Sequence, residues 1–339
     1  MNNYLTKELV TRSNNLSFFK YIGILPNPDK LLSRSGNAME RYRELENDPH
    51  LWSCIQSRKS GLVGHKFALM QDESSELVYE FVKRNFANID IPQLAKQMAD
   101  AVLFGFQPLE LVWQEVLWQR RHLYQIKFIQ PKPQEYFVYA PNGELKMLTK
   151  GNRNGERIPQ HKIVNIQHEA DYTNPYGQSL LSKAYWSVTF KNSAMRFWVN
   201  FIEKFDTPTI LATVTDEYNM MSAEEMEEIL DKIVEMQDKN AILTSGNINV
   251  NLHDNTKMGN VELYRELINL CNAEISKVIL SQTLTTEIGN GSYAAAKTHQ
   301  EIREDVIASD IELVLKGLNR VVSEICVLNF GEVSKPLFI

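Results

Sequence analysis

The stretch from Val261 to Asn329 consists of VELYRELINLCNAEISKVIL (261–280), SQTLTTEIGNGSY (281–293) and AAAKTHQEIREDVIASDIELVLKGLNRVVSEICVLN (294–329). Apolar residues recur every three or four positions in the first and third segments, which is the spacing of a helix with one buried face. The middle segment contains Gly289 and Gly291, which tolerate positive φ and offer little to pack, so both helices end there. The sequence therefore predicts two helices joined by a polar loop. That loop is either a plain hairpin turn or a loop held between long helices for a function.

Composition narrows the class of protein. The chain has 339 residues, of which 43% are hydrophobic and 10% aromatic, enough for a buried core in two domains or one elongated subunit. Its net charge of −6 argues against a protein that binds DNA tightly, but suits a surface that lets a polyanion pass. No run approaches the roughly 20 apolar residues that cross a bilayer. The three cysteines lack metal-type spacing, which favours reduced thiols in an intracellular protein. Together with the lack of a bilayer-length apolar run, this leads us to expect a soluble intracellular protein.

The first half of the chain predicts a mixed helix and strand domain. After a polar segment at 1–35, the apolar spacing indicates helices at 38–46, 49–62, 75–89 and 91–105. Alternating residues indicate strands at 65–70, 106–116, 123–130, 135–141, 144–150 and 161–168. Asn142-Gly143 is a strong hairpin signal, and the polar stretch 150–159 is expected to be a connection between strands.

The second half predicts a long helix, a small unit and another helix. Residues 178–205 are apolar almost all round, as expected of a helix buried on several sides, in a large core or between subunits. A strand–helix–strand pattern follows, and its helix begins with a capping box from Ser222 to Glu225. The outer face of that helix is acidic, which usually means solvated surface. Because long helices bracket this unit, the sequence predicts a small domain on a two-helix stalk.

Motifs for catalysis are missing. The sequence contains no phosphate-binding loop, nucleophile elbow or zinc-protease motif. His161 and His168 lie seven residues apart on an expected strand, so their side chains would point to opposite faces. Carboxylates on a solvated helix lack the shifted pKa values that acid–base catalysis needs. We therefore expect neither an enzyme, nor a metal site, nor a cofactor.

Four segments resemble the portal proteins of tailed phages, and most closely the Mu-like portal family. They are YRELENDPHLWSCIQSRKSGLVG (42–64), AVLFGFQPLELVW (101–113), NPYGQSLLSKAYWSVTFKNSAMRFWVNFIEKFDTP (174–208) and LSQTLTTEIGNGSYAAAKTHQEIREDVIASD (280–310). They span nearly the whole chain in the order found in that family, and the last two are the most distinctive.

The resemblance implies an α+β, portal-type subunit. Its parts would be a mixed α/β wing at 1–175 that includes an N-terminal arm at 1–35, stem helices at 176–205 and 259–282, a small α/β clip at 206–258, a tunnel loop at 283–293, and a long helix with a C-terminal tail at 294–339, with a short or absent crown. Such subunits form a homo-oligomeric ring, usually a dodecamer, at one capsid vertex of the virion. Double-stranded DNA passes through the ring non-specifically during packaging and exit.

The implied partners are the terminase large subunit, the capsid and the neck and tail proteins. No membrane is involved, and assembly would take place in the host cytoplasm. Another ring-forming head–tail connector or scaffold component is the alternative, and an enzyme acting on nucleic acid is disfavoured by the missing motifs.

Three groups of residues are the candidate sites on this interpretation. The DNA channel would be lined by Thr285, Thr286, Asn290, Ser292, Tyr293 and Lys297, although Lys297 is equally interpretable as a solvated lysine. The clip would bind partners through Glu224, Glu227, Glu228 and Asp231. The stem would form the subunit interface through Trp186, Phe197 and Trp198, which are spread around their helix.

Overall fold

A computed structural model gives the structure of the protein and describes residues 27, 38–206, 209–214, 224, 227, 248–253, 259–283 and 293–339. The chain divides into two compact units. We call them the body, which takes the residues up to Val188 and from Asn272 onward, and the insert, which is Thr189–Cys271.

Five short helices begin the described part of the body: α1 (Ala38–Leu45), α2 (Pro49–Val63), α3 (Glu76–Phe86), α4 (Ile91–Met98) and α5 (Asp100–Phe104). Three of them begin with a side-chain cap. Asp48 accepts a hydrogen bond from the backbone N–H of Leu51 at 2.9 Å, and Ser75 and Asp90 make the equivalent contacts for α3 and α4. The predicted helices are confirmed, except that the segment 91–105 forms two helices rather than one.

Three antiparallel sheets accompany these helices. The largest has the order β3–β2–β7 and contains β2 (Phe106–Trp118), β3 (Arg121–Pro131) and β7 (Ile163–Gln167). The second has the order β4–β5–β6 and contains β4 (Phe137–Tyr139), β5 (Leu145–Thr149) and β6 (Asn152–Arg157). A two-stranded pair joins β1 (Leu69–Met70) to β10 (Leu337–Phe338).

The sequence predictions missed one strand and made another too long. The polar stretch expected to be a connection contains β6, an edge strand that pairs with β5 through its backbone and so needs no apolar side chains. The strand expected at 65–70 is reduced to β1, because its partner β10 is only two residues long.

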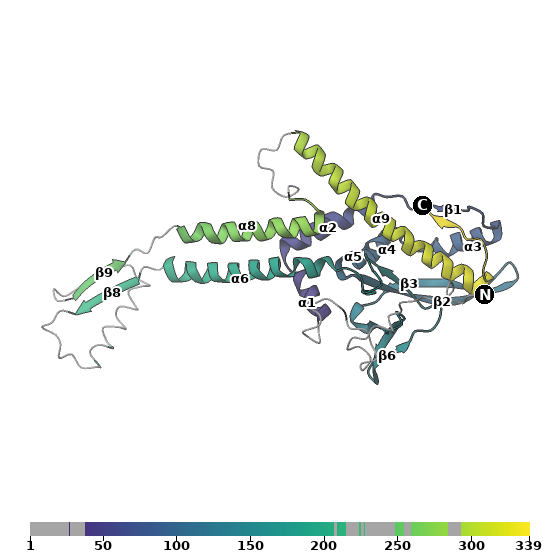
Figure 1. Ribbon diagram of the computed structural model, residues 1–339, viewed down its shortest axis with the longest axis horizontal. Coiled ribbons are helices and arrows are strands. Elements are labelled where there is room, and N and C mark those ends of the chain that lie inside the picture. The colour runs from purple at the N-terminus through teal and green to yellow at the C-terminus, as the bar shows by residue number, and fades with distance from the viewer. Residues whose placement is uncertain are drawn as a thin grey trace, which may run out of the picture. The chain divides into compact units, whose positions relative to one another are not determined.

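The long helix α9 (Tyr293–Phe330) packs on the three-stranded sheet (Figure 1) and contacts both outer strands, β3 and β7. Its buried residues join a core with the sheet, α3 and α4: Val314, Leu318, Val321, Val322, Ile325 and Cys326. Polar side chains of α9 bond to the backbone of each outer strand. Arg320 Nη1 donates to Asn165 O of β7 at 2.6 Å, and Asn329 bonds to both the N–H and the carbonyl of Tyr124 in β3.

A second core lies in the body and includes the first turns of α6 (Leu180–Asp206) and the last turns of α8 (Gly259–Leu280). Leu181 and Val188 of α6 and Ile275 and Ile279 of α8 are fully buried there, together with apolar residues of α1, α2 and α5. The two helices through which the chain enters and leaves the insert are therefore both anchored in this core.

Two glycines permit a backbone crossing where α5, β7 and α6 meet. Gly105 and Gly177 have φ values of 95° and 77°. A Cβ on Gly177 would lie 2.3 Å from the carbonyl oxygen of Gly105 and 2.4 Å from that of His168. The backbone N–H of His168 donates to Gly105 O at 2.8 Å, so these two segments cannot separate without losing a hydrogen bond. Glycine is required at this crossing for its φ and for its missing side chain.

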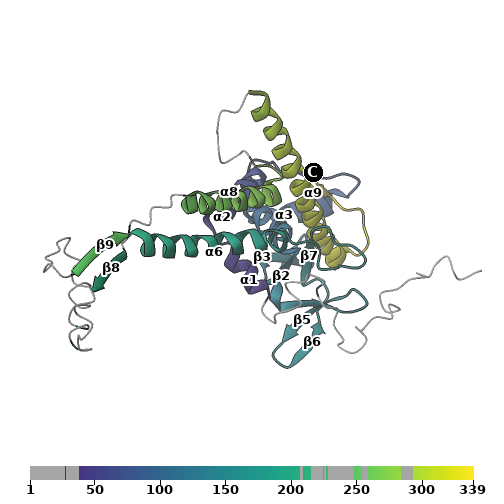
Figure 2. The same ribbon diagram turned by 60° about the vertical axis from the view of Figure 1, so that its left-hand side comes forward.

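The insert contains the remainder of α6 and α8 and an antiparallel pair of strands, β8 (Thr209–Val214) and β9 (Ile248–His253). Within it, α6 and α8 lie side by side (Figures 1 and 2), and the rings of Phe201 and Tyr264 are 6.1 Å apart. Most of the helix expected between the two strands lies outside the described residues. Among the described helices, none combines the length and apolarity needed to cross a bilayer.

Candidate functional site

Apolar side chains on α6 are divided between a buried and an exposed side. Leu181, Ala184, Val188 and Ala194 are buried at helical spacing. Trp186, Phe190 and Phe197 expose 54%, 54% and 62% of their surfaces. The sequence predicted a helix buried on several sides, whereas the single chain covers one side of its first half.

Trp198, the third predicted interface residue, is half-buried within its own chain. Its Nε1 atom is inaccessible to solvent and has no hydrogen-bond partner among the described residues.

The exposed apolar surface continues along the insert part of both helices. The large apolar side chains exposed there are Phe190, Met195, Phe197, Val199, Ile202, Leu263, Leu267 and Leu270. Large apolar side chains exposed in such number on two neighbouring helices are typical of surfaces that another molecule covers.

The segment expected to form the tunnel loop lies largely outside the described residues. Thr285, Thr286, Asn290 and Ser292 belong to that part. The structure begins α9 at Tyr293, so this residue starts the helix instead of ending the loop, and Lys297 lies in the next turn. On the other side, α8 ends at Leu280 and is followed by Ser281, whose φ of 57° turns the chain out of the helix.

Arg58 of α2 connects the two helices that flank this segment. Its Nε and Nη2 atoms donate to the two carboxylate oxygens of Asp310 in α9 at 2.7 and 2.8 Å. Its Nη1 atom donates to the backbone carbonyl of Ile279, in the last turn of α8, at 2.7 Å. The side chains of Arg58 and Asp310 are 12% and 3% exposed. Sequence reasoning missed this site, because the two charged residues are 252 positions apart.

Other residues of α2 contact the same helices. His50 Nε2 lies 2.9 Å from the carbonyl oxygen of Asn272 and 2.8 Å from Ser276 Oγ, both in α8. At Gly61 the approach of α9 is so close that an added Cβ would lie 2.4 Å from Ile307 Cδ1. The end of α8 and the middle of α9 therefore both pack against α2.

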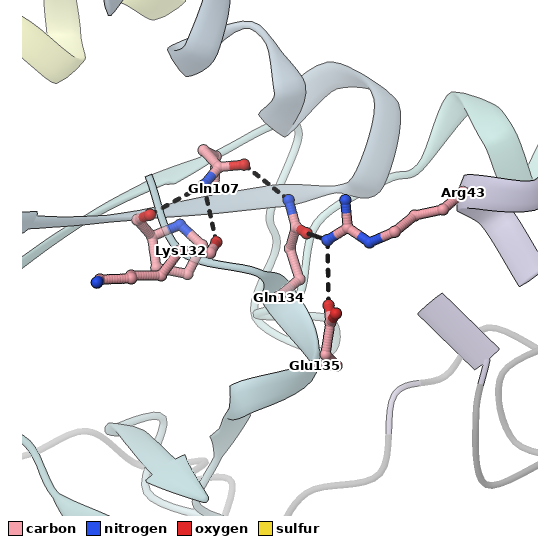
Figure 3. Close-up of polar contacts among 6 residues, drawn as sticks. Arg43, Gln107, Lys132, Gln134 and Glu135 are labelled. Carbon is pink, nitrogen blue, oxygen red and sulfur yellow. Dashed lines mark hydrogen bonds and ion pairs between the residues drawn. The ribbon is translucent and has the colours of Figure 1, made fainter. Parts of the chain in front are cut away.

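A chain of buried amides fixes α1 to the sheets (Figure 3). Gln107 of β2 donates to the carbonyl of Lys132 at 3.0 Å, and its Oε1 accepts from Gln134 Nε2 at 2.7 Å. Arg43 of α1 donates to Gln134 Oε1 at 2.8 Å and pairs with Glu135 at 3.1 Å. The side chains of Gln107 and Gln134 are almost fully buried, so these bonds satisfy groups that water cannot reach.

Two of the four predicted partner-binding carboxylates belong to the described part. Glu224 and Glu227 are helical and exposed, three residues apart and thus on one helix face. Glu228 and Asp231 lie outside the described residues.

The ionisable groups of the described residues do not gather into a reactive cluster. Burial raises the pKa of Tyr176 to about 12 and that of the Cys326 thiol to about 11, which makes both groups poorer nucleophiles at neutral pH. His161 and His168 have separate partners, Glu324 at 2.6 Å and the carbonyl of Gln178 at 2.7 Å. No three histidine, cysteine or carboxylate side chains of the described residues are grouped so that they could hold a metal ion.

Comparison with solved structures shows a shared fold. An HK97-family phage portal protein from Corynebacterium diphtheriae aligns with 88% of this chain and 94% of its own, at 12% identity and a TM-score of 0.50. A chain of the virion of a native gene transfer agent particle aligns over 88% of this chain and 82% of its own, at 15% identity and a TM-score of 0.56. A chain of the neck of an empty gene transfer agent particle reaches a TM-score of 0.59 at 14% identity, over 93% of this chain and 85% of its own.

The comparison with curated proteins found no match. The model of one protein family, described as the portal protein of Mu bacteriophage, matches residues 39–339. This range includes both helices that anchor the insert, the insert itself, and α9 with the strands beneath it. The chain therefore belongs to the Mu-type portal protein family.

Proposed function

We propose that this portal protein forms a homo-oligomeric ring at one capsid vertex, through which the genome is packaged and later leaves the virion. The observation that carries this proposal is the family match over residues 39–339. The exposed apolar side chains of α6 and α8 support it, because they need a covering partner and a ring of identical subunits supplies one. The role is that of a conduit, not of an enzyme.

The subunit interface in this proposal includes Trp186, Phe197 and Trp198. Repeating one contact around a closed ring requires two different, complementary surfaces on each subunit. The exposed leucines of α8 (Leu263, Leu267 and Leu270) are a suitable complement to the exposed aromatic residues of α6.

Negative-stain imaging and mass photometry of the purified chain test the ring directly. We expect a ring with a central hole and a mass that is a multiple of 39.1 kDa, with twelve subunits the expected number. A stable monomer or dimer at micromolar concentration would contradict the proposal.

Residues 283–293 and Lys297 are proposed to line the channel. Each phosphate that a lysine or arginine neutralises adds affinity, which would slow a moving duplex. A loop rich in hydroxyl and amide groups, such as those of Thr285, Thr286 and Asn290, makes weaker contacts. The chain's net charge of −6 agrees with a low-affinity conduit.

The loop is tested by replacing Gly289 and Gly291 with proline. Proline fixes φ and stiffens the segment, so we expect rings to assemble while DNA packaging or retention fails. The measurement is the length of encapsidated genome in particles carrying the variant. Full-length genomes at normal yield would place the constriction elsewhere.

The acidic helix that includes Glu224 and Glu227 is proposed to dock the terminase large subunit or the neck and tail proteins. Charge complementarity would speed that association and make it depend on salt. Replacing Glu224, Glu227 and Glu228 with glutamine should leave rings intact and weaken partner binding at low salt. Unchanged binding across a salt series would identify this helix as ordinary solvated surface.

A further inference from the structure

We propose that Arg58 is a positioning residue for the tunnel loop at 283–293, because its single guanidinium group bonds to both helices that flank this loop. The part of this inference that concerns DNA rests on the proposed function. The part that concerns the helices rests on the contacts of the body alone.

The first contact caps a helix end. The last four carbonyl groups of an α-helix have no partner within the helix, and a basic side chain can satisfy one of them. Ile279 is the penultimate residue of α8, and its carbonyl accepts a hydrogen bond from Arg58 Nη1 at 2.7 Å. The chain leaves the helix two residues later, at Ser281. Arg58 therefore fixes the point at which the segment leading to the loop begins.

The second contact fixes the returning helix. Asp310 lies in α9 and receives two parallel hydrogen bonds from Arg58, at 2.7 and 2.8 Å. Its carboxylate is 3% exposed, so water cannot replace a lost partner. A bidentate pair defines the orientation of both groups as well as their distance. Movement of α9 relative to the end of α8 would break one of these bonds.

Arginine suits this role and lysine does not. The planar guanidinium group presents one edge to a carboxylate and keeps a further N–H for another acceptor, whereas an ammonium group is a point charge on a flexible stem. Lysine at position 58 would keep the charge but could not hold Asp310 and Ile279 O in one rigid arrangement. The Arg58→Lys variant is therefore the sharpest test of positioning as opposed to charge balance.

The neighbouring residue of α2 provides a matched control. Lys59 pairs with Asp100 of α5, and these side chains are 18% and 26% exposed. This pair is more exposed than Arg58–Asp310 and lies on the same helix, but its ion pair joins α2 to α5 instead of to α8 or α9. Loss of the pair in Lys59→Gln should affect the stability of the body without loosening the packing of α8 and α9 against α2.

Hydrogen–deuterium exchange of the full-length, assembled protein measures the effect. In Arg58→Lys we expect the amides of residues 276–283 and 303–312 to exchange about tenfold faster or more, since lysine cannot hold both helices in one rigid arrangement. Lys59→Gln should leave both segments at the wild-type rate. Equal exchange in Arg58→Lys and wild type would overturn the proposal, and so would equal acceleration in both variants.

Asp310→Asn separates the two contacts and remains informative if Arg58→Lys does not fold. It removes the charge partner in α9 but leaves the bond from Arg58 to Ile279 O in place. Exchange should rise more in residues 303–312 than in 276–283, and uniform acceleration throughout the body would contradict the inference.

Particles carrying Arg58→Lys then test the consequence for DNA, for which we expect shortened or lost genomes. Faster exchange with normal genomes would support the positioning role and count against the channel role of the loop.

Discussion

Replacing Phe197 with alanine should weaken the ring without unfolding the subunit. In the single chain 62% of its surface is exposed, which is about 120 Å² of the ~200 Å² that a phenylalanine presents. Covering that area would contribute about 3 kcal/mol at each subunit contact, at ~25 cal/mol per Å². The alanine variant should lose most of this, and the concentration at which rings dissociate should rise about 100-fold. Mass photometry over a dilution series measures that concentration.

Tyr136→Ala is the matched control for Phe197→Ala. Tyr136 is an aromatic residue of the body with 56% of its surface exposed, and no proposed contact involves it. Its variant should dissociate at the wild-type concentration, and the melting temperature of each subunit should change little. Rings of Phe197→Ala that survive dilution as well as the wild type would refute the placement of this residue in the interface. Equal weakening by both variants would show that the effect is not specific to α6.

Four further substitutions concern the body. Gly177→Ala should destabilise it by about 2 kcal/mol or more in thermal denaturation, because φ is positive and a Cβ would meet two backbone oxygens. Gly331→Ala, with a similar φ but open space, should cost only about 1 kcal/mol. Asp48→Ala should cost about 1 kcal/mol in a denaturant titration, since the cap of α2 is lost. Burial, and next the charge of Asp100, raise the pKa of Glu46 above its ordinary value of 4.5. The protonated side chain therefore contributes its full stability below pH 4.5, and this contribution is lost as the pH rises through the raised pKa. Glu46→Gln should therefore raise the melting temperature at pH 7, by an amount that shrinks toward pH 4.5.

Local signals predicted those parts of the fold that short stretches of chain determine. The helix predicted at 49–62 begins where expected, and the structure places the cap bond of Asp48 there. The helical segment predicted at 91–105 ends at Gly105, where a φ of 95° turns the chain out of the helix. The polar strand β6 and the short strand β10 could not be predicted in this way. Their pairing depends on partners elsewhere in the chain, and their own residues carry no alternating apolar pattern.

The contacts of Arg58 were likewise not predictable from local sequence. An arginine inside a helix is ordinarily a surface residue, and nothing near Arg58 in the sequence points to Asp310 or to the carbonyl of Ile279. Only the fold brings them together, so the contacts by which Arg58 holds α8 and α9 could be found only from the structure.

The opposite holds for α6. Its sequence is apolar on more sides than one chain can bury, and the structure leaves Trp186, Phe190 and Phe197 exposed. Apolar residues in a sequence serve contacts within the chain and contacts with other subunits, whereas the structure of one chain shows only the contacts within that chain. The apolar surface that remains exposed on α6 is therefore where the partner should be sought.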